Sequence, residues 1–349
     1  MVRRSRRGQE FAIVLAAGLG SRLAALTRAV HTREMPKQFA TLCGDRSFLQ
    51  KTLDRIAPIV PSDRTVVVVA DDQAEMASKQ LGAYPGVEIL HEPKNRGTGA
   101  GVLLPLAHVL ARDPDARVVV FPSDHYFECE VAFQDSVARA MLAVEDAPKG
   151  VVLMGAAAEA PAIDLGWIVC GAASGPKAAH ARRVESFMEK PDGDTVLKLH
   201  GDGALCNTLV IAALGRALWS LAEQHVPAVC APLLSYRSLI GHRSAERRLR
   251  DIYSHLPATD LSRDILQRAQ GLVAISMIDA GWSDCGTPDR LFQALEKGGE
   301  LTKLLARLGP LFCGPIPRRT RLSLWGHPAP RRDVTATRRR WRVPSEALH

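Results

Sequence analysis

Short runs of apolar residues alternate with segments of helical spacing over the first half of the chain. The runs lack the strict alternation of apolar and polar positions that marks a strand with one face in solvent, which favours strands buried on both faces. We predict such strands at residues 11–17, 65–70, 87–90, 117–121 and 150–154, and helices at 48–59, 71–81, 102–111 and 130–145. This order predicts an α/β fold with a parallel, doubly wound sheet that binds ligands at the carboxyl ends of its strands.

The pattern changes in the second half of the chain. It predicts strand pairs and turns from residue 166 to 211, mostly helix over 214–255, a late strand at 272–276 and a last helix at about 288–308. We interpret this half as a continuation of the first sheet rather than a second domain. The sequence therefore predicts one domain over residues 11–309. A basic extension precedes it at 1–10, and an Arg- and Pro-rich tail, predicted to be disordered, follows at 310–349.

Composition narrows the class of protein further. Hydrophobic residues make up 46% of the 349 and aromatic residues 5%, which suits a soluble globular α/β protein. No apolar run reaches 18 residues, and the start of the chain holds no apolar segment long enough for a signal peptide, so we expect a cytoplasmic protein with no membrane partner. The seven cysteines are scattered and form no Cys-x-x-Cys pair, which favours reduced thiols over disulfides or a zinc site.

The net charge of +8 is concentrated at the two ends of the chain. Residues 1–10 carry a net charge of +3 and residues 318–349 carry +7, so the body between them is close to neutral. The arginine-rich tail, with Trp325 and Trp341 as stacking faces, could bind nucleic acid. No recognisable nucleic-acid-binding fold accompanies the tail, so nucleic acid is not the favoured partner.

A turn with the composition of a phosphate-binding loop follows the first predicted strand. Gly18 and Gly20 can take positive φ and lack a Cβ, so that backbone N–H groups can approach a bulky anion. Arg22 adds a planar, permanently charged fork, and Lys37 adds a mobile point charge. Leu23 stands where a dinucleotide-binding Gly-x-Gly-x-x-Gly turn has its third glycine, and no Gly-Lys-Ser/Thr follows. A phosphate-binding turn is favoured, and a purely structural turn stays open.

Three segments near the start of the chain resemble the opening motif of sugar-phosphate nucleotidyltransferases: Leu15-Ala-Ala-Gly-Leu-Gly-Ser-Arg-Leu23, Leu26-Thr27 and Pro36-Lys-Gln-Phe39. The Pro-Lys-Gln-Phe form is similar to the mannose-1-phosphate guanylyltransferase branch. Ala17 and Ala25 depart from the glycine and proline that the family often has. The resemblance implies a Rossmann-like doubly wound mixed, mainly parallel sheet of the nucleotide-diphospho-sugar transferase type. It also implies nucleotide binding by Ala17, Gly18, Gly20, Ser21 and Arg22.

Two aspartates resemble the metal ligands of this family. Asp124 follows a predicted strand in Pro-Ser-Asp-His, which is similar to the family's Pro-x-Asp-His, and Asp284 lies in Gly-Trp-Ser-Asp-Cys-Gly-Thr. Without the resemblance, an aspartate in the position of Asp124 is more often a helix cap or turn former, and Asp284 would be an ordinary residue of a glycine-flanked turn. The resemblance implies that both bind Mg²⁺, which takes oxygen ligands from few protein groups. We interpret His125 as structural.

A second group of residues resembles the sugar-phosphate site of the family. In Glu189-Lys190-Pro191, the resemblance implies that the glutamate accepts hydrogen bonds from sugar hydroxyls and that the lysine neutralises the sugar's phosphate. An exposed Glu-Lys pair before proline is also a common surface pattern. Asn207 can both donate and accept hydrogen bonds, and Gly166 matches a glycine that lets the backbone approach the sugar. Cys206 stands where the family commonly has tryptophan.

The segment Asn95-Arg-Gly-Thr-Gly99 resembles the loop that contacts the base and ribose, which implies nucleotide binding by Arg96, Gly97 and Thr98. A flexible surface loop is the alternative. Guanine offers both donors and acceptors on its edges, so backbone groups of such a loop can discriminate it. The preference for guanine over thymine or uracil rests only on Pro36-Lys-Gln-Phe39.

Together these motifs imply nucleotidyl transfer from GTP to mannose 1-phosphate, giving GDP-mannose and pyrophosphate. Arg22, Lys37 and Lys190 are the expected catalytic residues, Mg²⁺ is the expected cofactor, and a homodimer is compatible with the resemblance. Two alternatives stay open. One is the same reaction with glucose 1-phosphate and dTTP or UTP. The other is a catalytically silent, nucleotide-sugar-binding regulatory protein, which the departures at Ala17, Ala25 and Cys206 keep open.

Overall fold

The computed structural model describes residues 8–42, 44–174 and 180–308. The chain divides into a unit of residues 1–315 and a unit of residues 316–349, and every described residue belongs to the first. The predicted Arg- and Pro-rich tail at 310–349 and most of the predicted basic extension at 1–10 therefore lie outside the described residues.

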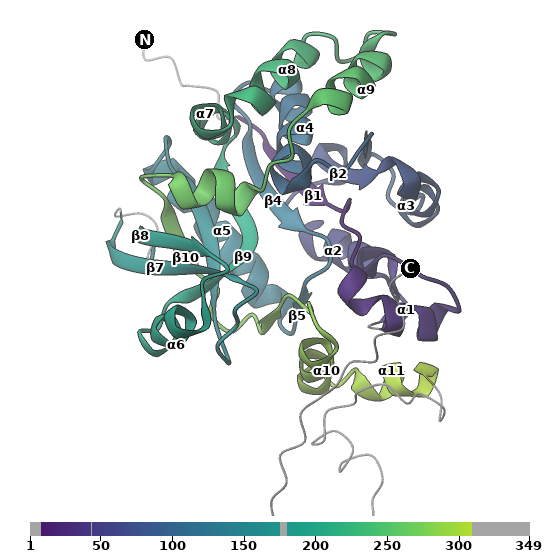
Figure 1. The fold of residues 1–349 in the computed structure, drawn as a ribbon, viewed down its shortest axis with the longest axis vertical. Coiled ribbons are helices and arrows are strands. Elements are labelled where there is room, and N and C mark those ends of the chain that lie inside the picture. Colours follow the sequence, from purple (N-terminus) through teal and green to yellow (C-terminus); the bar gives the residue numbers. More distant parts are fainter. Residues whose placement is uncertain (1–7, 43, 175–179, 309–349) are drawn as a thin grey trace, which may run out of the picture. The chain divides into compact units, whose positions relative to one another are not determined.

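Nine strands of the described chain form one mixed sheet in the order β3-β2-β1-β4-β9-β6-β10-β8-β7 (Figure 1). β1, β2 and β4 are almost entirely buried, as their unbroken apolar runs predict. β1 pairs in parallel with β2 and β4, whereas β9 runs antiparallel between β4 and β6. The strands of this sheet are β1 Glu10–Leu15, β2 Thr65–Ala70, β3 Glu88–Glu92, β4 Arg117–Pro122, β6 Val151–Ala157, β7 Gly166–Ala173, β8 Arg182–Glu189, β9 Leu205–Leu214 and β10 Val273–Ser276.

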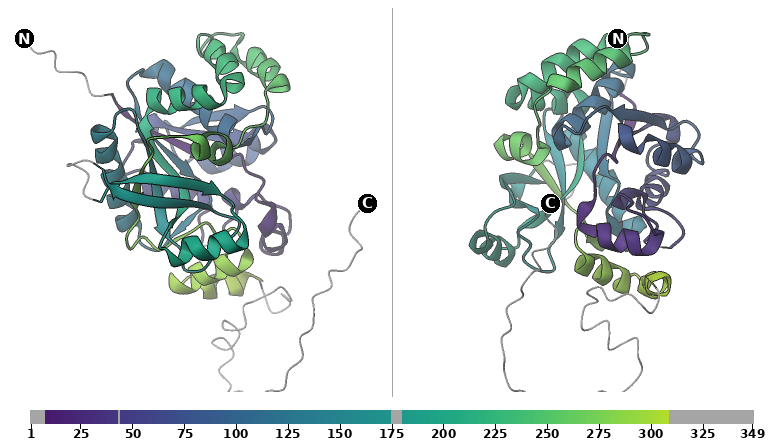
Figure 2. Two further views of the ribbon diagram at one scale, coloured as in Figure 1. Left: turned by 60° about the vertical axis from the view of Figure 1, so that its left-hand side comes forward. Right: turned by 45° about the vertical axis from the view of Figure 1, so that its right-hand side comes forward.

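Helices cover both faces of the sheet, as Figures 1 and 2 show. Alternate residues of β1 point to opposite faces, so Phe11 and Ile13 join a core with α4, α7, α8 and α9, while Ala12 and Val14 join a core with α2, α3 and α5. The helices are α1 Ala24–His31, α2 Phe48–Ile56, α3 Ala74–Leu81, α4 Gly97–Arg112, α5 Glu130–Asp146, α6 Gly193–Gly201, α7 Gly215–His225, α8 Pro227–Arg237, α9 Ala245–His255, α10 Pro288–Lys297 and α11 Leu301–Leu308.

The predicted fold class is confirmed. The sheet is mixed and mainly parallel, because only β8 and β9 run against the other strands. The second half of the chain supplies β7 to β10 to this same sheet rather than forming one of its own. A separate short ribbon pairs β5 (Tyr126–Phe127) with β11 (Trp282–Ser283), and it brings the segment after β4 beside the segment after β10.

Two predicted helix boundaries are wrong. The glycine-rich segment that we predicted as a loop before a helix at 102 is the first turn of α4, which begins at Gly97. This turn is tied to a distant segment, because the Gly99 N–H donates to the carbonyl of Thr259 (2.8 Å). The predicted last helix is two helices, α10 and α11. Gly299 adopts a left-handed φ of +70° between them, a conformation that ends a helix.

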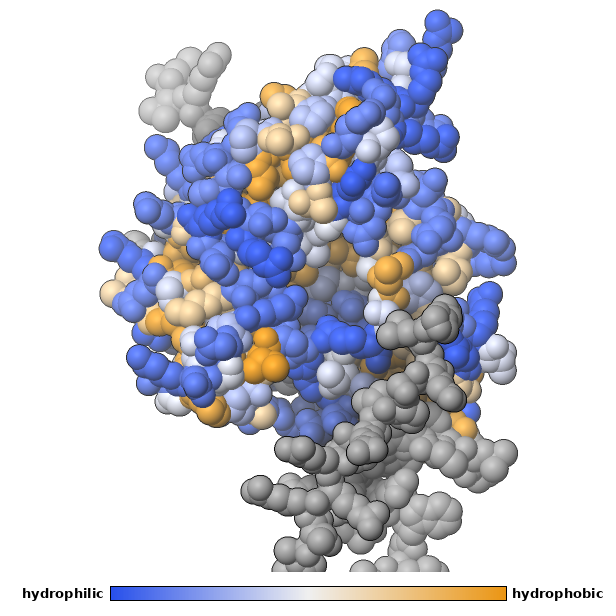
Figure 3. All heavy atoms as spheres, in the orientation of Figure 1, coloured by the Kyte–Doolittle hydropathy of each residue, from blue (hydrophilic) through white to orange (hydrophobic). Residues whose placement is uncertain are grey.

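None of the described helices is long and apolar enough to cross a bilayer. On the face shown in Figure 3, hydrophilic residues cover most of the surface and apolar residues form small separate groups.

Candidate active site

The turn after β1 lies at the carboxyl edge of the sheet. Gly20 has a left-handed φ of +61°, and a Cβ there would lie 2.6 Å from the backbone nitrogen of Lys37, so the position requires glycine. Gly18 does not adopt the left-handed region, contrary to what we allowed for it. The buried side-chain amide of Gln38 donates to the carbonyl oxygens of Ala16 (2.8 Å) and Gly18 (2.7 Å). These hydrogen bonds hold the turn in place.

The outer side of this turn is open to solvent. Gly18, Ser21 and Arg22 are exposed, and Ala17 and Gly20 are half-buried. A single 3₁₀ turn over Ser21–Leu23 connects the glycines to α1. The residues predicted to bind the nucleotide's phosphates therefore form one accessible segment, and their role in binding stays a prediction.

Lys37 connects the two predicted metal ligands. Its side chain is only 4% exposed, and its Nζ atom lies 3.1 Å from Oδ2 of Asp124 and donates to the backbone carbonyl of Asp284. Asp124 and Asp284 are 160 positions apart in the sequence, and the structure brings both to one ammonium group. Burial is the largest single influence on Asp124 and opposes its ionisation, but the charge and hydrogen bond of Lys37 and the neighbouring His125 together outweigh burial, so that the pKa of Asp124 is lowered. Lys37 is thus a buried, tethered cation rather than a mobile one.

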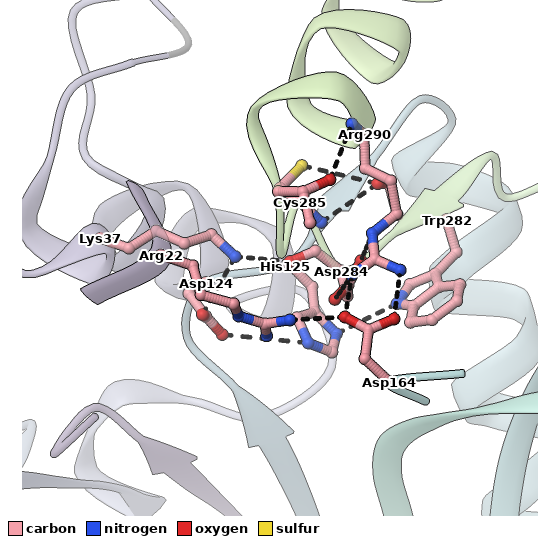
Figure 4. A network of polar contacts seen from close by, with 11 residues as sticks. Arg22, Lys37, Asp124, His125, Asp164, Trp282, Asp284, Cys285 and Arg290 are labelled. Atoms are coloured by element: carbon pink, nitrogen blue, oxygen red, sulfur yellow. Dashed lines mark hydrogen bonds and ion pairs between the residues drawn. The ribbon is translucent and has the colours of Figure 1, made fainter. Parts of the chain in front are cut away.

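A network of two arginines and two aspartates adjoins Lys37 (Figure 4). Arg290 donates from Nη1 to Oδ1 of Asp164 (2.8 Å) and from Nη2 to Oδ2 (2.5 Å), and its Nε lies 2.9 Å from Oδ1 of Asp284. Arg22 donates from Nη1 to Oδ2 of the same Asp164 (2.5 Å). Sequence reasoning missed Asp164 and Arg290. The only signal was that they lie within a few residues of Gly166 and Asp284, which were predicted as site residues.

His125 has a structural place in the site. The Trp282 indole donates to Nδ1 of His125 (3.0 Å), across the ribbon formed by β5 and β11. Burial lowers the pKa of His125 to about 4, so the imidazole is a neutral hydrogen-bond acceptor at neutral pH. This arrangement agrees with the structural role that we predicted.

The predicted sugar-phosphate residues also lie together. Gly166 and Glu189 are register partners of β7 and β8, and a Cβ at Gly166 would lie 2.7 Å from Oε2 of Glu189 and 3.4 Å from Cβ of Asn207. The Glu189 side chain is 8% exposed, and burial raises its pKa. Lys190 has a left-handed φ of +49° and a half-exposed side chain, with Nζ 3.3 Å from Oε1 of Glu189. Their role in sugar binding stays a prediction.

The predicted base-binding residues are held by the chain itself. The guanidinium of Arg96 donates to the backbone carbonyls of Tyr253 and Ser254 at the end of α9, both at 2.8 Å. The Thr98 hydroxyl accepts a hydrogen bond from the N–H of Leu261 (2.8 Å). Gly97 has a left-handed φ of +84° and packs against Thr259. Arg96 and Thr98 thus have internal partners, and a nucleotide role for this segment stays a prediction.

Asp124 and Asp284 have the donor chemistry that Mg²⁺ requires. Asp284 is 7% exposed, and its Oδ1 atom makes no hydrogen bond within the described residues, although Arg290 Nε lies nearby. Those residues contain no cluster of three or more His, Cys, Asp and Glu side chains that could enclose a metal ion. Mg²⁺ usually needs only one or two protein carboxylates and takes its other ligands from water and phosphate oxygens, so the two aspartates fit this ion.

Comparison with known proteins places this geometry in a family. The family model described as nucleotidyl transferase matches residues 11–300, which include every site residue discussed above. The chain belongs to this family. The matched region begins at Phe11, the first residue of the apolar run before the glycine-containing turn, and it ends at residue 300, beyond Asp284.

Several named proteins are similar to this chain over most of its length. The xanthan biosynthesis protein XanB of Xanthomonas campestris pv. campestris (strain B100) is 30% identical over 295 residues, which cover 82% of this chain and 60% of XanB. The mannose-1-phosphate guanylyltransferase ManC of Salmonella typhimurium is 28% identical over 290 residues, which cover 81% of this chain and 59% of ManC. The chain thus spans about 60% of the length of these relatives.

A solved structure has the same fold. The chain described as mannose-1-phosphate geranyltransferase from Thermus thermophilus is 29% identical and superposes with a TM-score of 0.70, covering 83% of this chain and 79% of that one. This similarity agrees with the nucleotide-diphospho-sugar transferase fold expected from the sequence.

Proposed function

We propose that the protein transfers a guanylyl group from GTP to mannose 1-phosphate, giving GDP-mannose and pyrophosphate. The observation that carries the proposal is the position of Lys37, which contacts both Asp124 and Asp284 beside the glycine-containing turn. A transfer between two phosphate groups needs positive charge at one point, because negative charge must be neutralised along the whole reaction path, and carboxylates contribute by holding a metal cation there. Membership of the nucleotidyl transferase family supports the same class of reaction.

The chemistry needs no nucleophile from the protein. A phosphate oxygen of the sugar 1-phosphate attacks the α-phosphorus of GTP, a new P–O bond forms, and the bond from the α-phosphorus to the bridging oxygen breaks as pyrophosphate leaves. Arg22 and Lys37 neutralise the nucleotide's phosphates, and Lys190 neutralises the sugar phosphate. Mg²⁺, when held by Asp124 and Asp284, supplies further positive charge to the phosphate oxygens.

The sugar side supports a polyhydroxyl substrate. Glu189 is a buried acceptor that lies beside Asn207, which can both donate and accept, and Gly166 leaves the space above them free of a side chain. Lys190 is half-exposed beside Glu189, so its ammonium group is accessible to a phosphate. This set suits a hexose hydroxyl on the glutamate and a 1-phosphate on the lysine.

The choice of GTP and mannose 1-phosphate rests on resemblance. Pro36-Lys-Gln-Phe39 is similar to the guanylyltransferase form of the motif, and ManC, a relative over 81% of this chain, is named a mannose-1-phosphate guanylyltransferase. Because the chain spans about 60% of that relative, the substrates are proposed for this chain rather than transferred to it.

Pyrophosphate release by the purified full-length protein tests the function. The assay contains Mg²⁺, mannose 1-phosphate and, in turn, GTP, ATP, UTP, CTP or dTTP, and it is repeated with glucose 1-phosphate. We expect release with GTP and mannose 1-phosphate and little with the other pairs. Release with glucose 1-phosphate and dTTP or UTP would correct the substrates but keep the reaction. Binding of GTP without release from any pair would refute the enzymatic proposal and favour a regulatory protein.

A further inference from the structure

Two guanidinium groups converge on a single carboxylate at the edge of the candidate active site (Figure 4). Arg22 reaches Asp164 from the turn after β1, and Arg290 reaches it from the first turn of α10. The three hydrogen bonds measure between 2.5 and 2.8 Å. Asp164 thus accepts hydrogen bonds from two arginines that are 268 positions apart in the sequence.

The two arginines lie close together beside a glycine. A Cβ on Gly286 would lie 3.0 Å from Nη2 of Arg22, 2.8 Å from Nη2 of Arg290 and 2.2 Å from Oδ2 of Asp284, so both guanidinium groups lie beside this glycine together with the Asp284 carboxylate. Two permanent positive charges this close repel each other unless an anion lies between them. The Asp164 carboxylate is the anion that both arginines share, whereas Asp284 pairs with Arg290.

We infer that Arg290 joins Arg22 in binding the pyrophosphate group of the nucleotide and of the product, and that Asp164 is an internal anion which pyrophosphate displaces. This inference rests on the proposed function. A pyrophosphate group carries several negative charges and oxygens that accept bidentate hydrogen bonds from guanidinium groups, whereas Asp164 offers one charge. The bound phosphates therefore compete successfully for both arginines.

The surroundings of Asp164 allow the exchange. The Arg22 side chain is 58% exposed, so its guanidinium can turn from the carboxylate to a phosphate without leaving solvent. Asp164 belongs to the segment between β6 and β7, which lines a cavity of about 320 Å³ together with Trp282 and the start of α10. This cavity offers room for the displaced carboxylate. Arg290 is more buried and also contacts Asp284, so it is the fixed member of the pair.

Direct binding of pyrophosphate to the full-length protein tests the inference. The titration is done by calorimetry in EDTA, so that binding does not depend on a metal ion. We expect Asp164→Asn to bind pyrophosphate about 5-fold more tightly than the unchanged protein, because the competing charge is gone, and Arg290→Gln to bind it about 10-fold or more weakly. Arg290→Lys, which keeps the charge but not the fork, should fall between Arg290→Gln and the unchanged protein.

Glu159→Gln is the matched control. Glu159 lies on the same segment and lines the same cavity, but it pairs with Lys297 instead of the two arginines. We expect this variant to bind pyrophosphate as the unchanged protein does. Equal affinity in Asp164→Asn and Glu159→Gln would overturn the role of Asp164. Unchanged affinity in Arg290→Gln, with an unfolding midpoint equal to that of the unchanged protein, would overturn the site itself.

The binding experiment separates this inference from the proposed function. Pyrophosphate binding that depends on Asp164 and Arg290, in a protein that forms no nucleotide sugar, would support the anion site and refute the enzymatic proposal. Formation of GDP-mannose together with pyrophosphate binding that ignores both residues would keep the enzyme and overturn the inference.

Discussion

Replacing Glu92 by glutamine should stabilise the protein at neutral pH, with the gain fading as the pH falls toward 4.5. Glu92 is the last residue of β3 and is 3% exposed. Its Oε1 atom makes no hydrogen bond within the described part of the chain. Burial raises the pKa of Glu92 to about 7, and the neighbouring Tyr253 hydroxyl offsets only part of this effect. The ionised carboxylate is therefore costly to the folded state.

The size of the effect follows from linkage between protonation and folding. The unfolded chain has the ordinary pKa of 4.5 and the folded protein a pKa of about 7, so the folded state binds more protons between these values and its stability falls as the pH rises. Each pKa unit corresponds to about 1.4 kcal/mol, which gives a loss of about 3 kcal/mol by pH 7 and above. Glutamine has nearly the same shape and no charge, so Glu92→Gln should recover most of this free energy at pH 7.5.

Urea unfolding followed by tryptophan fluorescence at pH 4.5, 5.5, 6.5 and 7.5 measures the difference. Glu88→Gln, on the same strand and face, is the control with the opposite sign. The hydrogen bond from His108 is the main cause that lowers the pKa of Glu88, and the charge of Arg112 adds to it. Glu88→Gln should therefore destabilise the protein at pH 7.5 and have less effect at low pH. A Glu92→Gln difference that stays constant from pH 4.5 to 7.5 would refute the reasoning.

Three further predictions concern the site. Asp124→Asn should lower kcat by about 100-fold or more, because a preorganised charge partner is lost. Asp135→Asn, at an exposed position of α5, is the control. Equal turnover of the two variants at saturating Mg²⁺ would contradict the assignment of Asp124 as a metal ligand. Lys190→Ala should raise KM for mannose 1-phosphate more than KM for GTP, and equal changes would contradict its assignment. Gly20→Ala should reduce the free energy of unfolding by about 1–3 kcal/mol because of its left-handed φ and its contact with Lys37, whereas Gly18→Ala, where a Cβ meets nothing within 4 Å, should have a much smaller effect in the same urea titration.

The sequence predicted the central strands well because burial on both faces leaves a local signature. β2 is an unbroken run of apolar residues after Thr65, and its observed bounds, Thr65–Ala70, equal the predicted ones. The signal for the turn after β1 was also local, because glycines and an arginine directly follow an apolar run. The glycine-containing turn after β1 and Asp124 after β4 lie at the same edge of the sheet, as expected for neighbouring parallel strands.

Features that depend on distant partners left no such signature. Glycines disfavour helix, so the start of α4 at Gly97 was missed, and its anchor, Thr259, is more than 150 positions away. The ion pair of Asp164 with Arg290 spans 126 positions and joins two residue types that are common on any surface. Only the folded chain shows that these charges face the site.

One segment of the chain contacts both the predicted base-binding turn and the predicted sugar-binding strand. Thr259 accepts a hydrogen bond from Gly99 at the start of α4, and eight residues later Gln267 accepts one from the N–H of Glu189 at the end of β8 (2.8 Å). The segment between Thr259 and Gln267 therefore fixes the predicted base-binding turn relative to the predicted sugar-binding strand. Neighbouring strands alone could not do this, because six other strands separate β3 from β8 in the sheet. The central sheet positions the predicted phosphate-binding turn and the two aspartates, and the segment from Thr259 to Gln267 links the predicted base-binding turn to the predicted sugar-binding strand.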